Sequence, residues 1–435
     1  MTPDESSNPV DSRISGREMM LLLLLASVQF TSIVDFMVVI PLGPELTERL
    51  SISASQFGLI VSSYTIAAGV AGILASGIMD RFGRKSAFLG LYAGFLIGTC
   101  FCGLAASYAG LLAARVLTGA FGGILGGMAL TIVGDTFPEH KRGRATGMLM
   151  SAFALASVAG VPIGIKLSNW ADWHAPFLVL AALGVPVLFA SLYLLPPMRD
   201  HLYDGPHPHP MARLADTFRQ PNHLRAFALV ATMMFGGFSV IPYIAVYLVG
   251  NVGLTKQDLP TIYVAGGLLT LFGAPIVGKL ADRFGKLPVY RVVAVLSAGM
   301  MLIVTHLPVV PVLIAAAATG TLMLTNAGRM VAAMAMVTGS VEPSRRGGFM
   351  SANSAVQHFS TGMGAYVGGL ILVSDPASHS LLYFEVVGYI AIAATIASLW
   401  LAGRVRPALK PLKTEGTLAM FDAVLDDPLS AAETL

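Results

Sequence analysis

The stretch SGIMDRFGRK, residues Ser76–Lys85, occurs a second time in this chain as GKLADRFGK, residues Gly278–Lys286. The shared DRFG tetrads begin at Asp80 and Asp282, an offset of 202 residues in a chain of 435. Arg142-Gly143 recurs as Arg346-Gly347 at an offset of 204. Gly160 and Gly164 recur as Gly364 and Gly368, also at an offset of 204. Ile40-Pro41 recurs as Ile241-Pro242 at an offset of 201. A near-constant offset of this kind indicates two copies of one structural unit.

The composition indicates what kind of unit is repeated. Hydrophobic residues make up 55% of the chain and charged residues 12%, about half of the roughly 25% charged share in a soluble domain. The two cysteines, Cys100 and Cys102, are too close in sequence for an ordinary disulfide, and we interpret them as small apolar packing residues. The chain is therefore expected to be an integral membrane protein, and its net charge of +3 gives no nucleic-acid footprint.

Apolar runs long enough to cross a bilayer as a helix, about 20 residues each, recur along the whole chain. We predict twelve of them, at residues 19–41, 54–77, 86–106, 108–134, 145–168, 175–195, 223–248, 259–280, 288–306, 310–338, 349–373 and 380–403. With the duplication, this predicts an all-α membrane fold of two pseudo-symmetric six-helix bundles. The first bundle is expected at residues 19–195 and the second at 223–403, joined by a cytoplasmic linker at 196–222. Cytoplasmic tails are expected at residues 1–18 and 404–435.

The basic residues predict the orientation of the chain in the membrane. Lys and Arg gather in the cytoplasmic segments of membrane proteins. With the N-terminus inside, 22 of them fall on the cytoplasmic side and three, Arg49, Lys166 and Lys256, on the other. We therefore expect both termini in the cytoplasm, at a bacterial inner membrane. The histidines of the linker lack cysteines or carboxylates in register, so we expect a flexible segment there and no metal site.

The two DRFG loops resemble the G-x-L-a-D-r-x-G-r-k signature of the major facilitator superfamily, with Ser76 in place of the usual leading glycine. The resemblance covers nearly the whole chain. It implies a transporter whose two halves rock around a midplane site, and a conformational latch for the outward-facing state, formed by Asp80, Arg84, Asp135 and Asp282. From the residues themselves we expect Asp80 to face the start of the helix near Gly347 and Arg84 to pair with Asp135. We expect Gly83 to permit a tight turn. The alternative is that these are ordinary loop charges.

Two further motifs resemble those of the drug:proton antiporter and sugar-efflux branch of the superfamily. RVLTGAFGG, residues Arg115–Gly123, has the R-x-x-x-G pattern that is linked to proton coupling in the drug antiporters. GVPIG, with Gly160, Pro162 and Gly164, resembles the antiporter motif in its G-V-P-x-G form. Glycines four residues apart let helices approach closely, and proline bends a helix, so a generic packing motif remains an alternative here.

Asp35 is an acidic residue inside the first predicted span, and Arg115 is a basic residue inside the fourth. Ionisable residues at membrane depth are costly and usually functional. At about 1.5 Å per residue, Asp35 lies roughly 9 Å and Arg115 roughly 10 Å from the same membrane face. We therefore predict that Asp35 carries the proton and that Arg115 is its partner. The alternative is a static ion pair that holds two helices together.

A second set of residues is predicted to line a substrate cavity. Arg329 keeps its charge when buried and needs an acceptor or an anionic ligand. For His358, a neutral packing role is as good an interpretation as a substrate or proton role. The aromatic residues of this set lie in helices that line or gate the cavity in the superfamily, and they are Phe36, Tyr64, Phe238 and Tyr243. A lipid-facing position is the alternative for each of them.

The resulting functional hypothesis is a secondary active transporter that couples proton entry to the efflux of small amphipathic organic compounds. A proton symporter or facilitator that imports a small polar nutrient is the alternative. The chain lacks HExxH, GxSxG and nucleotide-binding signatures, so we expect neither an enzyme nor a cofactor. The expected partners are a small-molecule substrate, protons and the lipid bilayer, and the expected state is a monomer.

Overall fold

The computed structural model describes residues 14–78, 82–198, 217–342, 345–375 and 380–408. Most of the predicted linker and of both tails, and residue Asp80 of the predicted latch, lie outside these ranges. In the first half the helices are α1 (Gly16–Val38), α2 (Gly43–Arg49), α3 (Ala54–Ile78), α4 (Arg84–Leu104), α5 (Tyr108–Thr136), α6 (Glu139–Leu155), the π-helix η2 (Ala156–Gly160), α7 (Val161–Trp170) and α8 (Ala175–Leu194).

The second half has the same plan. Its helices are α10 (Pro221–Val240), η4 (Ile241–Tyr243), α11 (Ile244–Gly250), η5 (Lys256–Asp258), α12 (Leu259–Phe284), α13 (Lys286–Thr305), α14 (Val312–Gly339), α15 (Arg346–Ile371) and α16 (Phe384–Ala402). A two-residue antiparallel hairpin pairs β1 (Val373–Ser374) with β2 (Leu381–Leu382) before the last helix. Each of the twelve predicted spans is helical, and most boundaries agree within a few residues.

Ten helical segments of the described chain are long and apolar enough to cross a membrane. The helices α14 and α15, with 28 and 26 residues, are also long enough. Both contain polar side chains within the span, among them the half-buried Asn326 and the buried Arg329 and Asn353. Together these twelve segments form the two six-helix bundles predicted from the sequence.

Local sequence signals explain several helix starts. Ser15 Oγ accepts a hydrogen bond from the backbone N–H of Glu18 (3.3 Å), and the Glu18 carboxylate accepts one from the N–H of Ser15 (2.7 Å). This capping box satisfies first-turn donors of α1. The helices α8, α10 and α12 each have a proline in the first turn, where the missing N–H removes no helical hydrogen bond.

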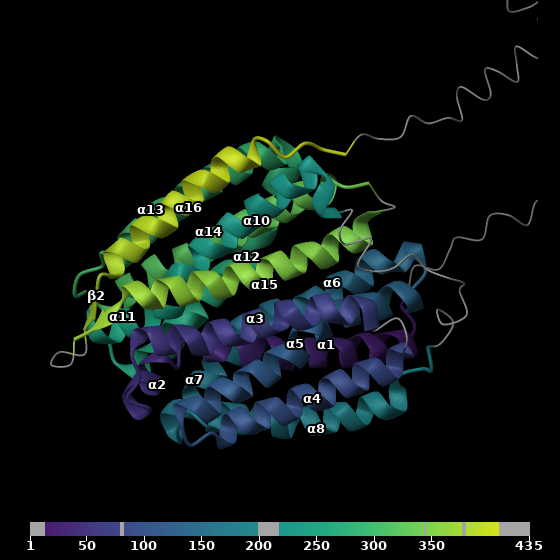
Figure 1. The fold of residues 1–435 in the computed structure, drawn as a ribbon, viewed down its shortest axis with the longest axis horizontal. Coiled ribbons are helices and arrows are strands. Elements are labelled where there is room, and N and C mark those ends of the chain that lie inside the picture. Colours follow the sequence, from purple (N-terminus) through teal and green to yellow (C-terminus); the bar gives the residue numbers. More distant parts are fainter. Residues whose placement is uncertain (1–13, 79–81, 199–216, 343–344, 376–379, 409–435) are drawn as a thin grey trace, which may run out of the picture.

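In Figure 1 the helices α1 to α8 form the lower bundle and α10 to α16 the upper one. The helices α3 and α15 run side by side along the middle, between the two bundles. The short helices α2 and α11 and the β1–β2 hairpin gather at one end of the molecule, at the left of the view. We call this the hairpin end, and we call the other end, where α1 begins and α16 finishes, the termini end.

The duplication found in the sequence is repeated in the helix packing. A Cβ atom placed on Gly160 would lie 2.3 Å from the side chain of Val34 in α1, and one placed on Gly164 would lie 2.5 Å from the side chain of Val38. A Cβ atom on Gly364 would lie 2.5 Å from the backbone of Phe235 in α10, and one on Gly368 would lie 2.4 Å from the backbone of Ser239. The contacted residues are again 201 positions apart. The glycines therefore allow the same close helix contact in each bundle.

The fifth span does not stay a regular α-helix. It changes to the π-helix η2 over Ala156–Gly160, immediately before Pro162. Proline has no N–H to donate to the preceding turn, so the regular hydrogen-bond pattern cannot continue through this position. The irregularity expected at Pro162 therefore takes the form of a π-helical segment, and this segment faces α12: a Cβ atom on Gly267 would lie 2.9 Å from the carbonyl oxygen of Ser157.

Candidate functional site

Asp35 and Arg115 meet in the interior of the first bundle. Arg115 Nη1 donates a hydrogen bond to Asp35 Oδ2 at 2.7 Å and lies 3.4 Å from the Asp35 backbone oxygen. Both side chains have no exposed surface. Asp35 stands three residues before the end of α1, and Arg115 in the third turn of α5, so both lie toward the hairpin end. The equal depth predicted from the sequence is matched by a direct contact.

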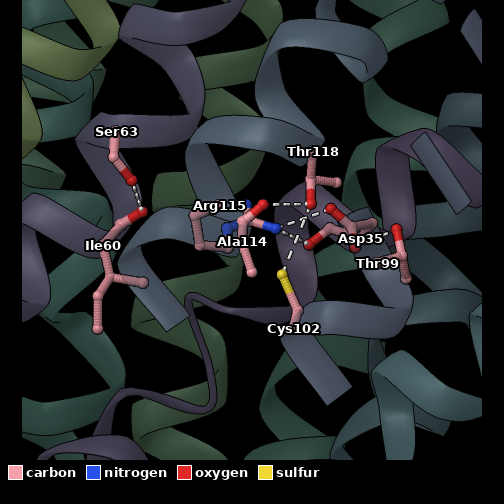
Figure 2. A network of polar contacts seen from close by, with 8 residues as sticks. All are labelled: Asp35, Ile60, Ser63, Thr99, Cys102, Ala114, Arg115 and Thr118. Carbon is pink, nitrogen blue, oxygen red and sulfur yellow. Dashed lines mark hydrogen bonds and ion pairs between the residues drawn. The ribbon is translucent and has the colours of Figure 1, made fainter. Parts of the chain in front are cut away.

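Neutral polar groups complete the surroundings of this ion pair, as Figure 2 shows. Thr99 of α4 donates a hydrogen bond to Asp35 Oδ1 (3.1 Å). The hydroxyl of Thr118 donates to the Ala114 carbonyl (2.7 Å) and lies 3.6 Å from the Cys102 sulfur. Cys102 therefore borders the ion pair, although the sequence suggested only an apolar packing role. The carboxylate has charged and neutral partners from two helices, α4 and α5.

The guanidinium of Arg115 is satisfied on one side by an aromatic ring. Its Nε and Nη2 atoms have no hydrogen-bond partner within the described chain. The ring of Tyr64 in α3 lies over the guanidinium instead, with 4.4 Å between the guanidinium carbon and the ring centroid. A buried contact of this kind is attractive because the face of the ring is electron-rich. Tyr64 is thus part of the charged site.

The R-x-x-x-G motif explains how Tyr64 reaches this position. Gly119 follows Arg115 by four residues, so both lie on the same face of α5. A Cβ atom on Gly119 would lie 2.2 Å from the Tyr64 carbonyl oxygen, and one on Gly123 would lie 2.2 Å from Ala68 Cβ. Only glycine allows the α3 backbone to come this close. The motif therefore sets the distance between α3 and α5 that puts the Tyr64 ring on Arg115.

Three of the four predicted cavity aromatics form a cluster that bridges the two bundles. The ring centroid of Phe36, next to Asp35, is 5.2 Å from that of Tyr64 and 6.1 Å from that of Phe238 in α10. Phe36 and Phe238 are half-buried and Tyr64 is buried. We call Phe36, Tyr64 and Phe238 the aromatic cluster. It connects the ion pair of the first bundle with the surface of the second.

The fourth aromatic residue, Tyr243, is placed elsewhere. It is fully buried, and its hydroxyl donates to the Ala365 carbonyl of α15. Its ring packs against Phe57 of α3 with 6.0 Å between centroids. Tyr243 therefore joins the bundles near the hairpin end and does not belong to the aromatic cluster.

Arg329 is also buried, with 1% of its surface exposed. Its Nη1 donates to Thr395 Oγ1 at 2.9 Å, its Nη2 lies 3.4 Å from the Met233 carbonyl oxygen, and its Nε has no partner within the described chain. His358 is half-buried in α15, where it packs beside Gly69 of α3 and makes no hydrogen bond to a described residue. The two predicted cavity residues therefore differ: Arg329 lies within the second bundle and His358 at the contact between bundles.

The predicted latch residues are only partly described. Arg84 Nε lies 3.3 Å from Asp135 Oδ2, as expected. Both residues belong to the first bundle, so this pair alone does not join the two halves. Asp282 is exposed near the end of α12.

The turn glycine of the DRFG motif acts differently in its two copies. Gly285 has φ +93°, a conformation that side chains avoid. Gly83, by contrast, has φ −59° and ψ 136°. Any residue adopts the angles of Gly83, so its own conformation does not require glycine, whereas the positive φ of Gly285 does.

Two features of the site were missed from the sequence. No sequence feature distinguished Thr99 as a partner of Asp35, because threonines are common in membrane helices. A contact between the bundles at the hairpin end joins Lys256 Nζ and Glu48 Oε2 at 2.5 Å, and Asn169 donates to the Lys256 carbonyl at 3.1 Å. Among the described residues, no group of three or more His, Cys, Asp and Glu side chains is arranged to hold a metal ion.

Comparison with known proteins agrees with this architecture. A sequence model described as Major Facilitator Superfamily matches residues 25–327 and, in a second match, 227–431. The chain belongs to the Major Facilitator Superfamily. The superfamily assignment makes the protein a membrane transporter and not an enzyme, and it agrees with the fold of two six-helix bundles.

Individual relatives are distant but cover much of the chain. The uncharacterized MFS-type transporter YceJ of Bacillus subtilis is 25% identical over 84% of this chain and 93% of its own length. A chloramphenicol resistance protein of Streptomyces lividans is 26% identical over 56% of this chain and 62% of its own. The crystal structure of a bacterial homolog of the human lysosomal transporter Spinster, inward-facing and occupied, superposes with a TM-score of 0.71 at 17% identity, covering 92% of this chain and 100% of that one.

Proposed function

We propose that this major facilitator is a proton-driven exporter of small amphipathic organic compounds. The observation that carries the proposal is the Asp35–Arg115 ion pair, 2.7 Å apart and fully buried. A carboxylate is the group that accepts and releases a proton in such a pair, because guanidinium does not lose its proton. Similarity to a chloramphenicol resistance protein supports export as the direction.

The proton affinity of Asp35 depends on two opposing influences. Removal from water favours the neutral carboxyl, whereas the guanidinium of Arg115 and the hydroxyl of Thr99 favour the carboxylate. A movement that lengthens the Arg115–Asp35 contact or admits water changes this balance. Proton binding then removes the attraction between α1 and α5, and proton release restores it. This is how one ion pair can link a proton to a helix movement.

The movement we propose is the rocking of residues 19–195 against residues 223–403, connected by the linker at 196–222. The excess of Lys and Arg on the termini side supports a cytoplasmic location of the termini end in a bacterial cell. Contacts between the bundles at the hairpin end, including Glu48–Lys256 and Phe57–Tyr243, then close the outer side. The conformation described here would accordingly be the inward-facing one.

The aromatic cluster is the proposed link between substrate and proton. Phe36 is the neighbour of Asp35, Tyr64 lies on Arg115, and Phe238 belongs to the other bundle. A planar apolar substrate that binds among these rings would separate them and shift Tyr64 from the guanidinium. Substrate binding would then act directly on the group that holds the carboxylate.

Everted membrane vesicles test this proposal. Respiration makes their lumen acidic, and an antiporter with its cytoplasmic side outward then takes up compounds as protons leave. We expect uptake of some members of an amphipathic panel that includes chloramphenicol, loss of uptake with a protonophore, and alkalinisation of the lumen on substrate addition. Uptake that survives the protonophore would indicate a facilitator, and uptake only with an alkaline lumen would indicate a symporter. Either result would contradict the proposal.

A further inference from the structure

Each bundle contains a buried guanidinium, and the two have different partners. Arg115 has a carboxylate partner at 2.7 Å in the first bundle. Arg329, equally buried in the second, contacts a threonine hydroxyl and a backbone carbonyl, and no Asp or Glu side chain of the described chain pairs with it. The position that corresponds to Asp35 at the repeat offset of 201 is Gly236. The second bundle thus contains a buried cation, at a position that is not the repeat equivalent of Arg115, and has no acidic residue at the position that corresponds to Asp35.

The atoms around Arg329 leave hydrogen-bonding capacity unused. Arg329 Nε and Asn326 Nδ2 are both buried donors without a partner in the described chain. Asn326 Oδ1 lies 3.4 Å from the Ser297 hydroxyl, which leaves its amide N–H groups available. Two donors, one of them on a charged group, therefore lie about one helical turn apart on α14 without an acceptor among the described residues.

The neighbouring helix α10 packs closely against both groups at Gly237. A Cβ atom on Gly237 of α10 would be 3.3 Å from Arg329 Nη2 and 3.8 Å from Asn326 Oδ1. A contact of 3.3 Å is tight for a Cβ atom, so glycine at this position lets α10 lie against the guanidinium. The next residue, Phe238, belongs to the aromatic cluster. The donors of α14 are therefore close to the aromatic surface proposed for the substrate.

A charge kept inside a membrane protein without a counter-charge is costly, and guanidinium cannot become neutral to avoid the cost. An anionic ligand removes the cost by supplying the missing charge and accepting the unused hydrogen bonds. We propose that Arg329 and Asn326 bind the acidic group of an amphipathic organic anion whose apolar part lies against Phe238. The inference rests on the proposed export function and specifies its substrate class: carboxylates, sulfonates or acidic phenols on an aromatic body.

Two fluorescent compounds that differ by one acidic group test this inference. 8-Anilino-1-naphthalenesulfonate is an anion, and N-phenyl-1-naphthylamine is the same ring system without the sulfonate. Their affinities are measured on the purified full chain in phosphatidylcholine nanodiscs, above the signal of empty discs. We expect Arg329→Gln to weaken sulfonate binding about tenfold, as for loss of a charge-assisted hydrogen bond, and to leave the neutral compound unchanged. The sulfonate affinity of Arg329→Lys should lie between those of the wild type and Arg329→Gln, because lysine keeps the positive charge but lacks the planar guanidinium.

A matched control is Arg404→Gln, which removes the same group from an exposed position over Trp400. It should bind both compounds as the wild type does. Equal weakening of both compounds by Arg329→Gln, or no weakening of either, would overturn the inference. The proposed export function is tested separately, by proton-coupled uptake of the neutral compound into vesicles. If this uptake is the same in Arg329→Gln as in the wild type, export remains supported even when the inference about Arg329 is overturned.

Thermal unfolding provides a readout that does not depend on transport. If Arg329 is a binding residue, the unliganded Arg329→Gln protein should unfold at the wild-type temperature or higher, because an uncompensated buried charge has been removed. The sulfonate should raise the unfolding temperature of the wild type but not of the variant. A variant that unfolds earlier and is still stabilised by the sulfonate would show that Arg329 is a structural residue.

Discussion

Arg115 Nη1 lies 2.7 Å from Asp35 Oδ2, and neither side chain has any surface exposed to solvent. The contact joins α1 to α5 across 80 residues of sequence. In such a pair each charge depends on the other, since loss of one leaves the other buried and uncompensated. The pair is therefore sensitive to anything that moves either helix, and this sensitivity is what a proton-coupled transporter requires.

Gly119 is predicted to be essential for the geometry of this site. Gly119→Ala would place a Cβ atom 2.2 Å from the Tyr64 carbonyl oxygen, so α3 must move away from α5. We expect lower thermal stability, by about 2 kcal/mol as for overpacking, and loss of coupled transport. Gly127→Ala, in the same helix with nothing within 4 Å of its Cβ position, is the control and should resemble the wild type. Similar behaviour of the two variants would contradict this role.

Tyr64 is predicted to act through its ring and not through its hydroxyl. Tyr64→Phe keeps the ring on the Arg115 guanidinium and should retain both stability and transport. Tyr64→Leu keeps apolar volume but loses the cation–π contact, and unfolding should become easier by about 1 kcal/mol. Thermal unfolding and vesicle uptake of the two variants check this. A Tyr64→Phe protein as impaired as Tyr64→Leu would show that the hydroxyl matters instead.

The Glu48–Lys256 pair is predicted to hold the bundles together at the hairpin end. Its side chains are 62% and 33% exposed, so water screens the attraction. Lys256→Gln should favour opening by about 0.5 kcal/mol, the size expected for an exposed pair, and added salt should reduce the difference. Spin-label distances between α2 and η5 measure the populations.

The exchanged pair, Glu48→Lys with Lys256→Glu, is the control for this prediction. It should restore the wild-type distances if attraction between the two charges is the cause. Unchanged distances in Lys256→Gln would exclude a gating role for the contact.

The sequence predicted the bundle fold and the Asp35–Arg115 pairing for physical reasons that act locally. Apolar runs, the repeat of DRFG and the rarity of charges in spans are all visible along one chain, and helix rise converts position into depth. The direction in which a side chain points from a span is not visible in this way. Tyr64 reaches Arg115 only because Gly119 lets α3 approach, and this depends on the packing of two helices.

Contacts between the halves were harder to predict. Glu48 and Lys256 are separated by 208 residues and belong to no repeated motif, so only the meeting of the bundles brings them together. Tyr243 resembled a cavity residue by composition and helix, but its hydroxyl is bound to Ala365. Gly83 shares its motif with Gly285 and yet adopts an ordinary conformation, so the shared motif did not predict the backbone angles.

The most direct measurement for Asp35 compares two modes of transport in proteoliposomes, with a compound that the vesicle assay identifies. Asp35→Asn resembles the permanently protonated side chain, and its amide oxygen can still accept the Arg115 hydrogen bond. We predict that this variant exchanges substrate across the membrane at equal concentrations, because binding and rocking remain, but does not accumulate substrate when a pH gradient is imposed. The wild type should do both. Accumulation by Asp35→Asn with the wild-type dependence on pH would contradict the assignment of Asp35 as the proton carrier.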